Sequence, residues 1–226
     1  MITAAGDDIS YPERAQTLCK AWQASACKLD LIASYANSIT HEGKPTGKTI
    51  KVDQLAKWKG AADWCAKRPY VVGATHAFTK RIWTEFGPIA SDIPYEDQIV
   101  ALRALCLGGA QTLELPLLDY RTGGVSAKAK GRSREEKRQH IEKRYTRQKA
   151  VFLQVQKDLV RAGQVQLWTG KVKRYLDRSV AALWLLRECS INFQNLNKIW
   201  EFGQQCGWFW LTKQIYYSCL SRIHKR

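Results

Sequence analysis

Apolar and polar residues come in alternating blocks at the start of the chain. A short apolar run at residues 1–5 predicts a strand, and residues 12–28 predict a helix. Residues 31–35 are mostly apolar and predict a second strand. Residues 36–51 are largely polar and predict a long loop. Strands and helices therefore alternate over the first quarter of the sequence.

The blocks continue to residue 120, where a segment rich in Gly, Ala and basic residues begins. Pro116 interrupts the last apolar run and splits it into two short strands. The elements predicted here are a helical stretch at residues 52–67, a buried strand at 70–75, helices at 79–86 and 94–107, and strands at 112–115 and 117–120.

From Ser133 onward the pattern is helical. An apolar stripe marks the first long helix, which Ala162 and Gly163 end, and a second helix is predicted at residues 171–188. Residues 196–224 are rich in aromatic side chains. We therefore expect two domains, one at residues 1–127 and a mainly α-helical one at residues 128–226.

Charge separates the same two parts. The chain has 226 residues, 45% of them hydrophobic, and a net charge of +16. Residues 1–120 carry 13 Lys and Arg against 13 Asp and Glu, whereas residues 121–226 carry 23 against 7. A neutral half of this kind suits an enzyme domain, and the basic half is expected to meet an anionic partner. A basic helical surface that serves only solubility is the alternative.

Cysteine usage and hydropathy indicate the cellular compartment in which the protein is expected. The seven cysteines are scattered and form no Cys-x-x-Cys pair, which indicates reduced thiols in a cytoplasmic protein. No run approaches the roughly 20 apolar residues of a membrane span. The start of the chain also lacks the pattern of a signal peptide.

Two adjacent carboxylates follow the first predicted strand. Asp7 and Asp8, preceded by Gly6, offer hard oxygen ligands at the carboxyl end of that strand. Phosphates and divalent metals bind at such edges in open α/β sheets. The alternative is a Gly-Asp turn that leads into a helix cap.

Three further motifs follow in order along the chain. Gly73, Ala74 and His76 come after a predicted strand, Glu96 and Asp97 open a helix, and Arg121 precedes a loop that contains Gly123, Gly124 and Ser126. Together with Asp7 and Asp8, this order resembles the C-terminal part of a family 2 glycosyltransferase. The resemblance covers residues 1–127. It implies an α/β fold with a partial GT-A (Rossmann-like) sheet, and an inverting, metal-dependent transfer from a nucleotide sugar in bacterial surface polysaccharide or glycan assembly.

The resemblance assigns the acidic residues roles. Asp7 and Asp8 match the Asp-x-Asp motif that binds Mg²⁺ or Mn²⁺, although Ala5 stands where the first Asp of the motif is expected and either aspartate remains a candidate ligand. Glu96 and Asp97 match the Glu-Asp pair of the family, which makes Asp97 the general base. Acids that favour the first turn of a helix are the alternative.

The other motifs would bind substrate. Gly73, Ala74 and His76 resemble the small-residue loop against which the donor sugar sits, and Arg121 lies where the family contacts the diphosphate. An ordinary turn histidine and a surface arginine are the alternatives. The acceptor would be a glycan or a lipid-linked sugar.

The resemblance begins at the acid strand itself. A family 2 enzyme begins with a strand-helix-strand unit that binds the nucleotide, and this unit has no counterpart in the sequence. We expect either a fragment of a longer reading frame or a degenerate scaffold. The isolated chain is not expected to be a competent enzyme.

The basic part combines Lys and Arg with Trp168, Trp184, Trp200, Trp208 and Trp210. This composition suits peripheral contact with the inner face of a membrane. A non-catalytic module that binds anionic lipid or nucleic acid is the competing function, although no nucleic-acid motif supports the second. Packing in a helical core is the third reading, and we favour it for Trp168 and Trp184.

Overall fold

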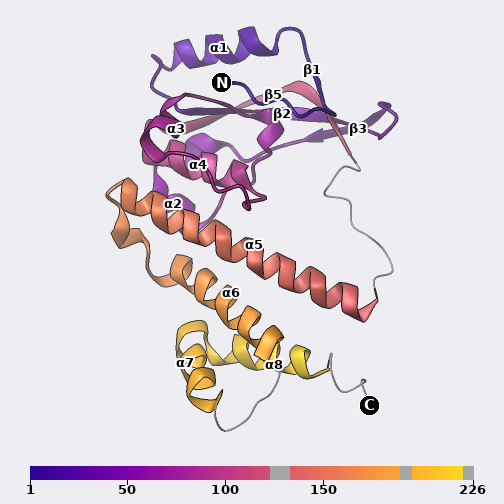
Figure 1. The fold of residues 1–226 in the computed structure, drawn as a ribbon. Coiled ribbons are helices and arrows are strands. Elements are labelled where there is room, and N and C mark those ends of the chain that lie inside the picture. Colours follow the sequence, from indigo (N-terminus) through magenta and orange to yellow (C-terminus); the bar gives the residue numbers. More distant parts are fainter. Residues whose placement is uncertain (123–132, 189–194, 221–226) are drawn as a thin grey trace. The chain divides into compact units, whose positions relative to one another are not determined.

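The computed structural model describes residues 1–122, 133–188 and 195–220 (Figure 1). The chain divides into two compact units. Unit 1 comprises residues 1–89, 95–128 and 157–167, and unit 2 comprises residues 90–94, 129–156 and 168–226. The predicted boundary between residues 127 and 128 lies outside the described residues, so it stays a prediction.

Unit 1 is built on a mixed sheet. Its strands are β1 (Ile9–Ser10), β2 (Leu31–Ile39), β3 (Pro45–Ile50), β4 (Ala77–Phe78) and β5 (Ala110–Arg121). Among the described residues the order is β1-β5-β2-β3, and β4 also pairs with β2. Of the strand pairs that the structure describes, only the central β2–β5 pair is parallel. The predicted α/β class is therefore correct.

Helices cover both faces of this sheet, with α1 on one side and α3 and α4 on the other (Figure 1). Leu18 of α1 packs against Ile32 and Leu117. Every residue of α4 from Ile99 to Leu105 is buried, which makes α4 the central helix of the unit. The helical segments are α1 (Arg14–Ala24), η1 (Leu55–Lys57), α2 (Ala61–Ala66), η2 (Gly73–Thr75), α3 (Arg81–Phe86) and α4 (Glu96–Cys106).

The loop predicted at residues 36–51 is wrong. β2 continues to Ile39, and β3 returns beside it as a hairpin. The turn closes through a hydrogen bond from Thr40 N–H to Lys44 O, 2.8 Å, and Gly43 adopts φ +85°. β3 is mostly exposed at the sheet edge, so its polar side chains hide the strand from a hydrophobicity pattern.

Three other segments differ from prediction. The opening strand is an isolated bridge between Ile2 and Ala77. The strand expected at 70–75 is absent: residues 73–75 form the 3₁₀ helix η2, with a short β4 after it. Residues 58–60 divide the helix expected at 52–67 into η1 and α2. Conversely, β5 runs through Pro116 as one strand, because a register shift against β2 accommodates the proline there. The helices predicted at 79–86 and 94–107 are confirmed as α3 and α4.

Within unit 1, a buried ion pair joins residues 157–167 to α4. Arg103 of α4 donates from Nε and Nη2 to the two carboxylate oxygens of Asp158, at 2.7 and 3.1 Å. Both side chains are fully buried. Arg103 Nη1 also donates to Gly87 O at 2.8 Å. This group explains why a segment assigned by sequence to the helical region clusters with the sheet.

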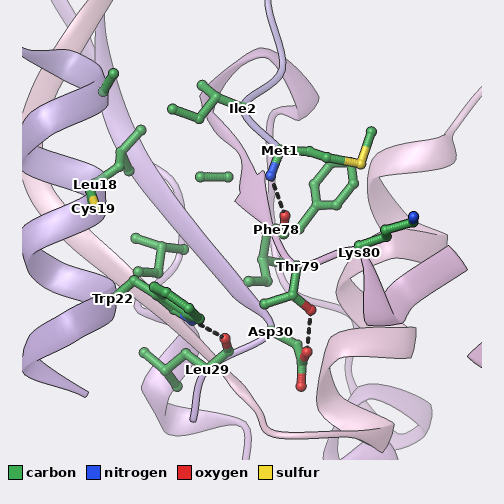
Figure 2. A pocket seen from close by; sticks show the side chains of 14 residues that line it. Met1, Ile2, Leu18, Cys19, Trp22, Leu29, Asp30, Phe78, Thr79 and Lys80 are labelled. Atoms are coloured by element: carbon green, nitrogen blue, oxygen red, sulfur yellow. Dashed lines mark hydrogen bonds between the residues drawn. The ribbon is translucent and has the colours of Figure 1, made fainter. Parts of the chain in front are cut away.

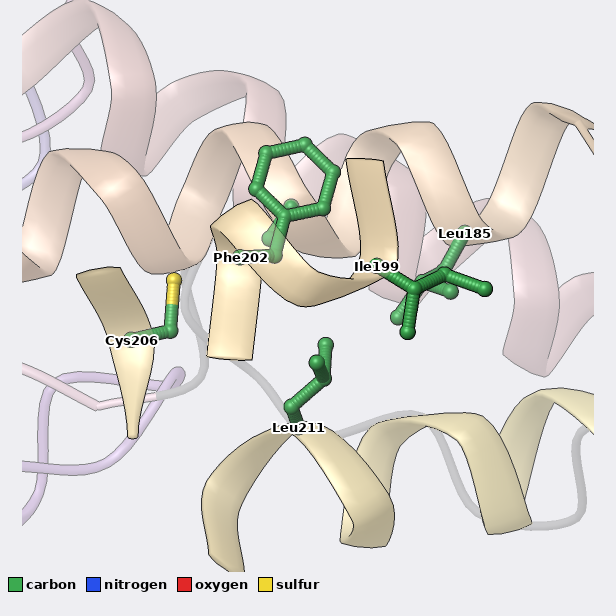
Figure 3. Close-up of a cluster of buried hydrophobic side chains, with 6 residues drawn as sticks. Leu185, Ile199, Phe202, Cys206 and Leu211 are labelled. Atoms are coloured by element: carbon green, nitrogen blue, oxygen red, sulfur yellow. The ribbon is translucent and has the colours of Figure 1, made fainter. Parts of the chain in front are cut away.

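Unit 2 is helical, as predicted. It contains residues 134–156 of α5 (Arg134–Arg161), together with α6 (Gly170–Glu188), α7 (Leu196–Cys206) and α8 (Trp208–Leu220). Figure 3 shows its main core, in which Leu185 of α6 meets side chains of α7 and α8. The buried members are Ala181, Leu185, Ile199, Phe202, Cys206 and Leu211. Trp184 packs against this core, in agreement with the interior position predicted for it.

Within the part of the chain that the structure describes, no helix combines the length and apolar character needed to cross a membrane.

Candidate functional site

The turn that carries Asp7 and Asp8, which we call the acid turn, is hydrogen-bonded to the end of β5. Arg121 N–H donates to Asp8 Oδ1 at 2.9 Å, and Arg121 Nε donates to Asp7 O at 2.8 Å. Its Nη1 donates to Thr40 O at 3.2 Å and to His41 O. The Arg121 guanidinium, predicted to bind diphosphate, therefore uses these donors on backbone carbonyls and holds the turn before β1 beside the β2–β3 hairpin.

Asp8 is the more enclosed of the two acids. Its Oδ2 is buried and has no hydrogen-bond partner among the described residues, whereas the Asp7 side chain is exposed. Burial raises the pKa of the Asp8 carboxyl, and the Asp7 charge adds to the shift; the Arg121 N–H bond and the charges of Arg121 and Arg14 oppose it. The acid pair thus couples an exposed carboxylate to a half-buried one.

Arg14 joins the acid turn to η2. It is 3% exposed and donates from Nη1 to Ser10 Oγ at 2.8 Å and from Nη2 to Ala74 O at 2.6 Å. Its Nε is buried without a partner among the described residues. The Arg14 charge contributes to the pKa shifts of both Asp8 and His76. Arg14 therefore lies within electrostatic range of the acid turn and of the residue that follows η2.

His76 is an interior residue. Its ring is buried, and Nε2 has no partner among the described residues. Burial, with the nearby Arg14 charge, lowers the His76 pKa to about 4, so the ring is neutral at physiological pH. The side chain predicted to touch substrate is thus buried in the interior rather than displayed on the surface.

Asp97 faces Gly73. A β-carbon on residue 73 would lie 3.3 Å from Asp97 Cβ and 4.0 Å from Glu96 Oε1, so any larger residue would press on Asp97. Burial raises the Asp97 pKa to about 6, and the Glu96 charge adds to this shift. Opposing it are backbone hydrogen bonds, among them Gln98 N–H to Asp97 Oδ1 at 2.7 Å.

Tyr120 connects the acid pair to Asp97. Burial raises the pKa of its phenol, and so do the negative charges of Asp8, Asp7 and Asp97. All three carboxylates therefore lie within electrostatic range of one hydroxyl. The structure brings together groups that are about ninety residues apart in sequence.

The predicted residues converge only in part. Asp7, Asp8 and Arg121 meet at the end of β5. Gly73 lies against Asp97 and Glu96, and Arg14 links Ala74 to Ser10. Gly123, Gly124 and Ser126 lie outside the described residues. Sequence reasoning missed Arg14 and Tyr120. A basic residue in the first turn of a helix, where the macrodipole disfavours it, was the available signal for Arg14.

Asp7 and Asp8 fit only a cation that takes its remaining ligands from phosphate and water. No group of three or more His, Cys, Asp or Glu side chains suited to a metal occurs among the described residues. Asp7 and Asp8 could hold Mg²⁺ or Mn²⁺ if phosphate and water supplied the remaining ligands, as Mg²⁺ prefers. The exposed Asp7 carboxylate and the unpartnered Asp8 Oδ2 are compatible with that arrangement.

A separate cavity of about 340 Å³ lies between α1 and β4 (Figure 2). Its lining is mainly apolar and includes Leu18, Trp22 and Phe78, with Lys80 at one side. None of the predicted site residues lines it. Its chemistry suits apolar packing and not phosphate or sugar binding.

Comparison with known protein families, curated proteins and solved structures gives no match to this chain.

Proposed function

We propose that unit 1 is part of a GT-A glycosyltransferase that transfers a sugar from a nucleotide donor to a glycan or lipid-linked acceptor. The support is chemical. An acid pair suited to a cation and the Asp97 carboxylate, whose pKa is raised, both act electrostatically on Tyr120, and a turn of small residues lies against Asp97. These are the groups that displacement of a diphosphate by a hydroxyl requires.

Asp97 carries the proposal. In the reaction, the acceptor oxygen forms a bond to the anomeric carbon as the bond from that carbon to the diphosphate breaks. Asp97 accepts the acceptor's proton. With a pKa of about 6, it is ionised at neutral pH yet more basic than an ordinary aspartate. Because Gly73 has no side chain, the turn leaves room for Asp97 to approach it.

Asp7 and Asp8 would hold the cation. When bound, a divalent cation offsets the charge that develops on the leaving diphosphate. Arg121 fixes the backbone of this turn, and Arg14 balances the Asp8 charge. Gly73 and Ala74 would lie against the donor sugar.

The test is release of nucleoside diphosphate from a panel of nucleotide sugars with Mn²⁺ or Mg²⁺. It is run on this chain and on a version extended upstream along its reading frame. Turnover of at least one donor is expected from one of the two proteins. Asp97→Asn should abolish turnover and keep donor affinity. Full turnover in Asp97→Asn refutes the role of Asp97, and no turnover of any donor by either protein refutes the proposed function.

A further inference from the structure

Helices α7 and α8 of unit 2 present apolar side chains to water. We call this set the aromatic face. Phe209 is 87% exposed and Trp200 62%, values that stand out for such large rings. The members are Leu196, Trp200, Trp208 and Phe209. Exposed apolar clusters of this kind mark interaction surfaces.

The aromatic face is held in place from beneath. The rings of Trp200 and Trp208 lie 5.2 Å apart, centroid to centroid. Trp208 rests on Gly203, where an added β-carbon would come within 2.4 Å of its ring. The opposite sides of the two helices carry Phe202 and Leu211 into the buried core (Figure 3). Exposure is therefore a consequence of how the two helices pack.

The half of the sequence that contains this surface is basic. Residues 121–226 carry 23 Lys and Arg against 7 Asp and Glu. On the two helices of the aromatic face, Lys198 and Lys213 are exposed against a single exposed acid, Glu201. A partner that suits both features combines negative charge with an apolar layer just beneath it.

We propose that the aromatic face docks on an anionic phospholipid surface, with its rings at the level of the headgroups. Trp and Phe at that depth contact acyl chains while nearby Lys and Arg meet lipid phosphates. This inference concerns unit 2 and does not depend on the proposed transferase activity.

Two other partners fit less well. Stacking of single-stranded nucleic acid uses ring faces open to the bases, but Trp200 and Trp208 pack against each other at an angle of 58°. Leu196 also has no part in stacking. A second copy of the chain would bring together two molecules of charge +16, which repel one another.

The experiment is flotation of the full chain with two kinds of vesicle, phosphatidylcholine alone and phosphatidylcholine mixed with phosphatidylglycerol. Binding to the mixed vesicles, weakened by added salt, is expected. Phe209→Ala and Trp200→Ala should each weaken it about tenfold, because each removes a ring that would leave water. Circular dichroism verifies that the variants keep their helices.

Leucine supplies the matched control. Leu196 in the aromatic face and Leu153 on α5 are each 45% exposed. Leu196→Ala should weaken vesicle binding severalfold, whereas Leu153→Ala should not change it. Equal effects of the two substitutions contradict a defined docking face.

Three further results would overturn the proposal. The first is no binding to the mixed vesicles, and the second is binding that Phe209→Ala leaves intact. The third is a loss in Phe209→Ala of oligonucleotide binding or of self-association in sedimentation, with vesicle binding unchanged.

Discussion

The β-carbon of Asp97 lies 3.3 Å from the position that a β-carbon on Gly73 would occupy. The two residues are 24 positions apart in the chain, at the start of α4 and the start of η2. The space left by one missing side chain thus sets how closely the turn approaches the carboxylate. It also lets burial raise the Asp97 pKa to about 6.

Gly73→Ala should disturb Asp97 more than it disturbs the fold. The added methyl must displace Asp97 by a few tenths of an ångström, and we expect a loss of about 1 kcal/mol in stability. The Asp97 pKa should move further up, because the methyl excludes water from the carboxylate. Carbon NMR of the labelled Asp97 carboxyl measures this directly.

Gly6→Ala is the control for that change, since nothing lies within 4 Å of a β-carbon at residue 6. It should leave the Asp97 titration where it is. A Gly73→Ala protein with an unaltered Asp97 pKa would contradict the close approach described here.

Asp97→Asn should stabilise unit 1 at neutral pH. The folded-state pKa of about 6 lies above the ordinary 3.8, so the ionised carboxylate opposes folding. This cost is absent below pH 3.8, grows as the pH rises to about 6 and is constant above it. Removing the charge should raise the unfolding free energy by about 2 kcal/mol at pH 7.

Urea unfolding of wild type and Asp97→Asn at pH 7 and pH 3.5 tests the sign. The two proteins should differ at pH 7 and converge at pH 3.5. If Asp97→Asn were less stable than wild type at pH 7, the Asp97 carboxylate would be a stabilising ion and not a buried base.

Short motifs in the sequence supplied the candidate site residues, whereas the hydrophobic pattern predicted only part of the sheet. Asp7 and Asp8 were chosen because they follow a predicted strand, and Asp97 because it opens a predicted helix. β3 was missed because an exposed edge strand needs no apolar residues. Arg14 contacts Ala74, and Tyr120 lies within electrostatic range of Asp7, Asp8 and Asp97. These partners are far away in sequence, and no local pattern encodes such pairs.

Breaking the Arg103–Asp158 pair should strongly destabilise unit 1. Asp158→Asn leaves a fully buried guanidinium without its counter-charge, which costs about 3–5 kcal/mol. Unfolding in urea, followed by a signal from unit 1, gives the magnitude. A matched surface pair, Lys173 with Asp177, has its Lys 49% exposed. Asp177→Asn should therefore cost about 0.5 kcal/mol or less.

Asp158→Asn and Asp177→Asn make the same chemical change on α5 and α6, so their difference isolates burial. Equal losses in the two variants would mean that the Arg103–Asp158 pair is solvated in solution.

Gly203→Ala should displace Trp208 from α7. Alanine is the better helix former by about 1 kcal/mol, yet its methyl would sit 2.4 Å from the Trp208 ring. Since the ring must move away, its contact with Trp200 is lost, and the net effect on the stability of unit 2 should be a loss of about 1–2 kcal/mol. The near-ultraviolet circular dichroism signal, which reports coupled tryptophans, should weaken.

In the Trp208→Ala background the same Gly203→Ala change removes no contact and should instead stabilise the helix. A destabilising effect in both backgrounds would show that Gly203 matters for a reason other than Trp208.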